Sequence, residues 1–69
     1  MKKLIGQLEV GDKVFVHVGG RKFKSACEVR EIVFNNVGEE NETATILFDD
    51  GTGQWLQNWY ITELIEVIL

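Results

Sequence analysis

The most informative segment of this 69-residue chain lies in its second half and reads Thr45-Ile46-Leu47-Phe48-Asp49-Asp50-Gly51-Thr52-Gly53-Gln54-Trp55-Leu56. It holds two short apolar runs joined by residues rich in Asp and Gly. Such residues favour tight turns, because Asp bonds to nearby backbone and Gly tolerates positive φ. The segment therefore predicts a β-hairpin, with one strand over residues 43–49 and its partner from residue 54. Side chains alternate along the first strand, so Ala44, Ile46 and Phe48 should share one face.

A second hairpin is predicted upstream of this segment. Residues 13–18 carry valine at every second position, and these valines should face the core. Gly19-Gly20 follows at once and predicts a turn of two residues. That turn would set Val16 opposite Phe23 and so place Phe23 on the valine face. Continued alternation would point Ser25, Cys27 and Val29 inward as well.

The rest of the chain supplies a bend, a loop and a last strand. The apolar alternation changes parity after Val29, which predicts a bulge near residues 30–31. Residues 35–42 are acidic and aperiodic, so we expect a mobile loop there. Residues 59–64 suit one short 3₁₀ turn, and residues 64–69 are apolar enough for a buried strand.

Together these segments predict one all-β domain that spans residues 1–69, with residues 1–9 as a lead-in. A chain of this length buries only one small core. We therefore expect five short strands to form a closed or nearly closed barrel. A deep catalytic cavity is not expected in so small a domain.

The charges are divided along the chain. All seven Lys and Arg lie in residues 1–30, which carry a local net charge of +4. Residues 31–69 hold eight acids and no base, and the whole chain has a net charge of −4. If the two halves interleave, the surface is mixed; if they do not, two opposed patches would select partners by charge.

Three sequence features bear on location. No apolar run approaches the roughly 20 residues that cross a bilayer. The N-terminus becomes acidic at Glu9 and Asp12, before a signal-peptide core develops. The single cysteine, Cys27, allows no internal disulfide. We therefore expect a cytoplasmic protein that makes no membrane contact.

Several short motifs follow one another along the chain. They are Val10-Gly11-Asp12-Lys13-Val14, Phe23 followed by Ala26 and Val29, Ile46-Leu47-Phe48-Asp49-Asp50, Gln54-Trp55-Leu56, and Trp59 with Leu64. With these motifs the sequence resembles the Tudor branch of the SH3-like small barrels over roughly residues 9–66. It is most similar to Tudor domains of Polycomb-like chromatin proteins. The resemblance implies a five-stranded SH3-like or Tudor-like barrel, with one short 3₁₀ turn before the last strand.

The resemblance also implies a ligand site. Tudor domains of this kind hold methylated lysine or arginine among about four aromatic rings, because a diffuse cation is attracted to π faces. Carried over by position, the site would use Phe23, Phe48 and Trp55, with Asp50 as the acidic neighbour. The remaining aromatic position falls on Val18, or on His17 if the register slips by one residue.

The residues themselves leave simpler interpretations open. Phe23 and Phe48 could be core side chains on the valine face. If Leu56 faces inward, alternation sends Trp55 to the barrel rim or outside. Asp49-Asp50 beside Gly51 is also typical of a turn.

Two other classes of partner remain open. Basic residues of the first half could contact nucleic acid around Phe15, namely Lys13, Arg21, Lys22, Lys24 and Arg30. Alternatively, the acidic second half could present a negative surface to a basic protein, as small phage or mobile-element inhibitors do.

Our interpretation is a non-catalytic module that binds a peptide or basic protein partner through an aromatic rim. No acid, base and nucleophile come together in the sequence, so neither an enzyme nor a cofactor is expected. His17 and Cys27 are too few for a zinc site of four ligands, so no metal is expected. We expect a monomer or a weak homo-oligomer.

Overall fold

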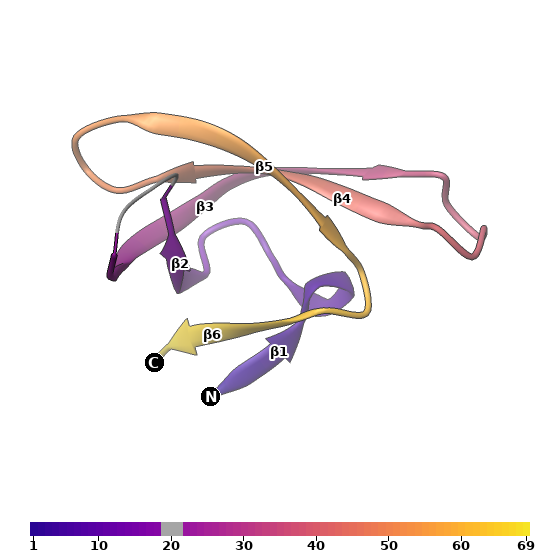
Figure 1. Cartoon of the computed structure of the whole chain (residues 1–69), viewed down its shortest axis with the longest axis horizontal. Coiled ribbons are helices and arrows are strands. Elements are labelled where there is room, and N and C mark those ends of the chain that lie inside the picture. The colour runs from indigo at the N-terminus through magenta and orange to yellow at the C-terminus, as the bar shows by residue number, and fades with distance from the viewer. Residues whose placement is uncertain (19–21) are drawn as a thin grey trace.

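Six strands form one antiparallel sheet in the computed structural model, which describes residues 1–18 and 22–69 (Figure 1). The order across the sheet is β1-β6-β2-β3-β4-β5. The strands are β1 (Lys2–Leu4), β2 (Lys13–His17), β3 (Lys24–Asn35), β4 (Thr43–Asp49), β5 (Gln54–Tyr60) and β6 (Leu64–Ile68).

The predicted all-β fold is confirmed, but the sheet has six strands instead of the expected five and is not closed into a barrel within the described residues. β1 pairs with β6, so it adds a sixth strand and forms one edge of the sheet, while β5 forms the other edge. These two edges do not pair with each other within the described residues. β1 escaped prediction because its three residues are too few to show an alternating pattern.

The predicted bulge is confirmed and gives the sheet its bend. Val29 pairs with Phe48, whereas Leu47 pairs with Glu31, so Arg30 is the extra residue on β3. β3 is the longest strand, and its first part pairs with β2 while its second part pairs with β4. The bulge therefore lies where β3 passes from one half of the sheet to the other, and such bulges bend a strand.

The core lies on the inner face of the bent sheet. The predicted face of β4 is confirmed, since Ala44, Ile46 and Phe48 are all fully buried. Residues from the other strands and from the lead-in complete one contiguous cluster, which also contains Ile5, Leu8, Val14, Val16, Cys27, Val29, Ile65 and Val67.

The short helical turn lies at the other end of the chain from the predicted place. The 3₁₀ helix covers Ile5–Gln7, while residues 61–63 form a turn between β5 and β6. The Ile5 N–H donates to the Glu63 carbonyl over 2.9 Å, and the Gly6 N–H donates to the Ile61 carbonyl over 3.1 Å. The lead-in is therefore tied to the β5–β6 turn, and it covers one end of the core with Ile5.

The hairpin between β2 and β3 has a longer connection than predicted. Val16 pairs with Ser25 and His17 with Lys24, which shifts the register by two residues from the expected Val16–Phe23 pair. A shift of two preserves the faces, so Cys27 and Val29 point inward as predicted. The predicted Gly19-Gly20 turn lies outside the described residues.

The acidic loop begins at residue 36, because Asn35 still belongs to β3. It connects β3 to β4 at the tip of a long hairpin, and Figure 1 shows this tip far from both chain termini. The loop and the basic N-terminal strands therefore lie toward different ends of the molecule, which favours the expectation of opposed charged patches.

Candidate binding surfaces

The predicted aromatic rim does not form around Phe48. Its ring is fully buried in the core. It is paired in register with Trp55 on β5, with ring centroids 6.0 Å apart and planes tilted by 35°. The prediction that Phe48 contacts a ligand is therefore wrong, because the inner face of β4 is covered by the rest of the core.

Trp55 faces inward, opposite to the predicted parity. Its side chain is half-buried against the core, whereas Leu56 is 65% exposed. The indole Nε1 is shielded from solvent and meets no acceptor among residues 1–18 and 22–69. The prediction of Trp55 as an open rim residue is wrong, because cross-strand partners share a face and Phe48 faces inward.

Phe23 is an exposed ring and not a core residue. It lies before the start of β3, and 75% of its surface is open to solvent. The Lys22 Nζ sits 5.7 Å from its ring centroid. Within the described residues the only close pair of aromatic rings is Phe48 with Trp55, so Phe23 does not join them.

Asp50 shapes the turn between β4 and β5. Its Oδ1 accepts hydrogen bonds from the Thr52 N–H over 2.8 Å, the Thr52 hydroxyl over 2.7 Å and the Gly53 N–H over 3.0 Å. The interpretation of Asp49-Asp50 as turn residues is confirmed. As a ligand-binding residue, Asp50 is not placed beside an aromatic cage.

Asp49 is also committed to local contacts. Its Oδ1 accepts from the Gly51 N–H over 2.7 Å, while its Oδ2 accepts from Gln54 and Arg30. The pKa of the Asp49 carboxyl lies below its ordinary value, first because of the Gly51 N–H and then because of Gln54 and Arg30. Asp49 therefore stays ionised and anchors both the turn and Arg30.

The structure brings part of the predicted basic strip together. Lys13, Phe15 and Lys24 project from the outer face of β2 and β3, opposite to the core. Arg30 is neutralised, since its guanidinium lies 3.3 Å from both Glu28 and Asp49. Lys22 lies by Phe23, and Arg21 lies outside the described residues. The strip thus reduces to two lysines around one phenylalanine.

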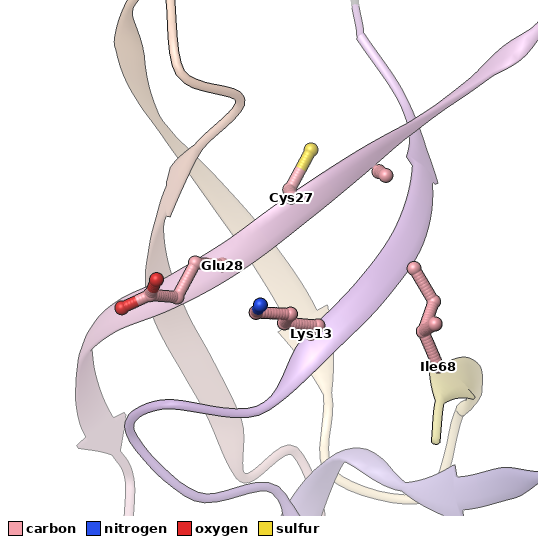
Figure 2. Close-up of a pocket in the computed structure, with 5 residues that line it drawn as sticks. Lys13, Cys27, Glu28 and Ile68 are labelled. Atoms are coloured by element: carbon pink, nitrogen blue, oxygen red, sulfur yellow. The ribbon is translucent and has the colours of Figure 1, made fainter.

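Figure 2 shows the end of this outer face nearest the C-terminus. Lys13 and Glu28 come from neighbouring strands, and Ile68 stands beside them on β6, while the Cys27 sulfur points away from Lys13. The hollow between these residues has a volume of about 150 Å³. The Cys27 thiol donates to the Ser25 carbonyl over 3.4 Å, and the side chain is buried.

A larger groove lies where β2 and β6 diverge, and sequence reasoning missed it. The ladder between these strands ends at the Phe15–Glu66 pair, although β2 continues to His17 and β6 begins at Leu64. The groove has a volume of about 380 Å³. Its walls come from five strands and include Lys2, Phe15, Val16, His17, Lys24, Gln57, Trp59, Leu64, Ile65 and Glu66.

Two side chains of β5 form one end of this groove. The Trp59 Nε1 donates to the Gln57 Oε1 over 3.1 Å, and the Gln57 Nε2 donates to the His17 carbonyl over 2.9 Å. β5 is thus joined to the end of β2 by side chains rather than by a backbone ladder. The sequence did contain a signal for this end of the groove, because Trp55, Gln57 and Trp59 are spaced two residues apart and so lie on one face of the strand. Which face of the sheet that is depends on the register with β4.

The outer edge of β5 is a further surface. β5 pairs with β4 along its whole length without a bulge, and within the described chain no strand lies on its other side. Its sequence, Gln54-Trp55-Leu56-Gln57-Asn58-Trp59-Tyr60, contains neither charge nor proline. Leu56 and Tyr60 are exposed on its outer face. Natural edge strands usually carry charges, prolines or bulges that block pairing, and β5 carries none of these.

Among residues 1–18 and 22–69, no group of three or more His, Cys, Asp or Glu side chains is placed to hold a metal ion. The same residues include no helix with the length and apolar character needed to span a membrane.

Comparisons with protein-family models, with curated proteins and with solved structures gave no match to this chain. The fold and its surfaces therefore define a small all-β domain, and its function is inferred from its own geometry.

Proposed function

We propose that this protein is a non-catalytic binding module that adds an extended, basic peptide segment of a protein partner to the free edge of β5. The observation that carries the proposal is the seven-residue edge itself, which is regular and uncharged and pairs with no second strand among the described residues. Backbone N–H and C=O groups along such an edge supply affinity to an added strand, while exposed side chains supply selectivity.

The ends of β5 favour a basic occupant. Asp50 precedes the strand, and Glu63 follows it with its Oε2 accepting the Tyr60 N–H over 2.8 Å. Glu42 lies near the Glu63 end of β5, because its backbone carbonyl accepts the Ile61 N–H over 3.3 Å. An added peptide with an uncharged middle and a lysine or arginine at each end would match this pattern of charge.

A second copy of this chain is a poorer occupant of the same edge. Antiparallel pairing of two β5 strands about Gln57 would set Gln54 of one copy beside Tyr60 of the other. The Asp50 end of one copy would then face Glu63 of the other. Like charges that face each other across paired strands are destabilising, so self-pairing is disfavoured.

The proposal includes a relation to the SH3-like small barrels. β2 to β6 follow the order β6-β2-β3-β4-β5, so the last strand returns beside the first of the five. This is the order needed to wrap a meander of five strands toward a barrel. We propose that the sheet is an open form of such a barrel, in which the Gln57 and Trp59 side chains occupy the unclosed seam.

A model peptide tests the binding proposal. The probe is an N-acetylated, C-amidated peptide with Lys at both ends and alternating Val and Thr between them, titrated against the labelled protein by amide chemical shifts. We expect the largest shifts on β5. A matched peptide with Glu at both ends should bind at least about tenfold more weakly, because it faces Asp50 and Glu63.

Two variants locate the site. Leu56→Lys adds a positive charge on the β5 edge and should weaken binding of the Lys-ended peptide by about tenfold. Leu64→Lys makes the same change at a leucine of similar exposure on β6, and it should leave binding unchanged. Equal binding of both peptides, shifts confined to other strands, or peptide-free dimerisation through β5 would each overturn the proposal.

A further inference from the structure

The groove between β2 and β6 has a composition that differs from the rest of the surface. Two aromatic rings line it, Phe15 on β2 and Trp59 on β5. Phe15 is 39% exposed and lies near the centre of the outer face, paired across strands with Glu66 and Ala26. A flat, partly open ring beside a groove of about 380 Å³ can stack against a planar group, and the volume lies in the range of small-ligand sites.

Lysines flank Phe15 on this face. Lys2 pairs in register with Glu66 on one side of Phe15, and Lys24 pairs with His17 on the other side. Lys13 lies on the same outer face, two residues before Phe15. Among residues 1–18 and 22–69, none of these three ammonium groups makes an ion pair, in contrast to Lys3, which pairs with Asp12.

Each acid of this face lies beside a cation. Glu66 lies 3.1 Å from the N-terminal amine, and Glu28 lies 3.3 Å from Arg30. The pKa of Glu66 is below its ordinary value, first through the hydrogen bond from that amine and to a smaller extent through the charges of Lys2 and Lys24. The face is therefore locally positive, although the whole chain has a net charge of −4.

We propose that this face binds single-stranded nucleic acid, with one base stacked on Phe15 beside the groove while Lys2, Lys13 and Lys24 contact phosphates. Aromatic rings interleaved with unpaired cations are what a sequence-tolerant single-strand surface needs. A duplex keeps its bases stacked inside, so it would offer this groove no ring. The site is centred on Phe15 and shares only the Gln57 and Trp59 side chains with β5, and the proposal does not rest on peptide binding at the β5 edge.

Fluorescence anisotropy with a labelled oligothymidylate of about ten nucleotides tests the proposal, because this length lies within known single-strand site sizes. Three phosphate contacts predict that raising monovalent salt from about 50 to about 200 mM weakens binding about 20-fold. A duplex of the same length and free thymidine monophosphate should bind more weakly than the single strand. No binding at the lower salt, or equal binding of the duplex, overturns the proposal.

Charge variants separate the lysines from general electrostatics. Lys24→Gln and Lys2→Gln should each weaken oligonucleotide binding at low salt by about threefold or more and reduce the salt dependence. Lys22→Gln removes the same charge from a side chain outside the groove, beside Phe23, so it should change binding little. An equal loss from Lys22→Gln would show that only net charge matters and would overturn the site.

A second pair of variants tests stacking. Phe15→Leu keeps an apolar side chain but removes the ring, and it should weaken binding by at least about fivefold. Phe34→Leu makes the same change at a phenylalanine that is 42% exposed on the second half of β3, outside the groove. Denaturation of both variants should show that they remain folded. If Phe15→Leu is folded and binds as the wild type does, the stacking contact does not exist.

Discussion

The Gln57 side chain on β5 donates a hydrogen bond of 2.9 Å to the backbone carbonyl of His17 at the end of β2. This contact crosses the seam that a closed barrel would seal with a backbone ladder. Gln57 also accepts the Trp59 indole N–H, so one amide satisfies two groups at the seam. The half-buried amide thus holds the free strand against the rest of the sheet.

We predict that Gln57→Leu lowers the free energy of unfolding by about 1–3 kcal/mol, because it leaves the His17 carbonyl and the Trp59 N–H without their partner. Urea denaturation followed by tryptophan fluorescence measures the change. Gln54→Leu, the same substitution at an exposed position of β5, removes one exposed hydrogen bond to Asp49 and should cost less than Gln57→Leu, at most about 1 kcal/mol. Equal losses in the two variants would mean that the Gln57 contact contributes nothing specific.

Phe48 and Phe23 should differ sharply in their contribution to stability. Phe48 is fully buried, so Phe48→Ala should cost about 3–5 kcal/mol, most of the stability of so small a domain. Phe23 is 75% exposed, and Phe23→Ala should lie within about 0.5 kcal/mol of the wild type. Chemical denaturation compares them. A folded Phe48→Ala protein of near wild-type stability would contradict its place in the core.

The turn between β4 and β5 should tolerate alanine at one glycine and not at the other. Gly51 has φ of 90°, where a Cβ costs about 1–2 kcal/mol, whereas Gly53 does not have positive φ. An added Cβ meets no atom within 4 Å at either position, so backbone conformation is the only difference. Gly51→Ala should therefore destabilise the protein, and Gly53→Ala should be close to neutral.

Thermal unfolding of the two alanine variants gives the comparison. A melting temperature for Gly53→Ala that falls as far as that for Gly51→Ala would show that something other than positive φ is required in this turn.

Asp12 should stabilise the fold in a pH-dependent way. Its Oδ2 accepts the Glu9 N–H over 3.0 Å and the Lys3 ammonium over 3.1 Å, and the Glu9 N–H is the main cause of its lowered pKa. A carboxyl whose pKa is lower in the folded state contributes its full stability above the unfolded pKa. That contribution is lost as pH falls through the folded pKa, below the ordinary value of 3.8.

We therefore predict that Asp12→Asn destabilises the protein near neutral pH and that the difference shrinks at a pH below 3.8, where the wild-type carboxyl is progressively protonated. Urea midpoints at both pH values measure this. Glu40→Gln, in the exposed loop, controls for the loss of one charge. A destabilisation by Asp12→Asn that is the same at both pH values would show that the ionised carboxylate is not the source.

Local sequence rules determined a large part of this fold. The alternation over residues 43–49 set the inner face of β4, because side-chain period and burial are linked within one strand. The Asp49-Asp50-Gly51 turn followed from side-chain bonds that span only two or three residues. The parity change after Val29 located the bulge in β3. An extra residue near that point is needed to return the following apolar side chains to the core face.

Only the tertiary structure decided which face of β5 is buried. Apolar residues occupy both parities of this strand, as Trp55 and Leu56 show, so periodicity left the choice open. The pairing of Asp49 with Gln54 set Trp55 opposite Phe48 and turned Leu56 outward. The length of the turn, and not the strand sequence, made that choice, because each added residue reverses every side chain beyond it.

Both candidate surfaces also depend on contacts between distant residues. The groove assembles Lys2, Phe15, Lys24, Trp59 and Glu66, which no spacing in the sequence relates. The edge of β5 is free because β1 pairs with β6 and not with β5. β1 has only three residues, too few to show an alternating pattern, so the sequence gave no sign of that strand. Local patterns fix the face and turn of each strand, but edges and grooves are set by which strands meet, and that is a property of the whole chain.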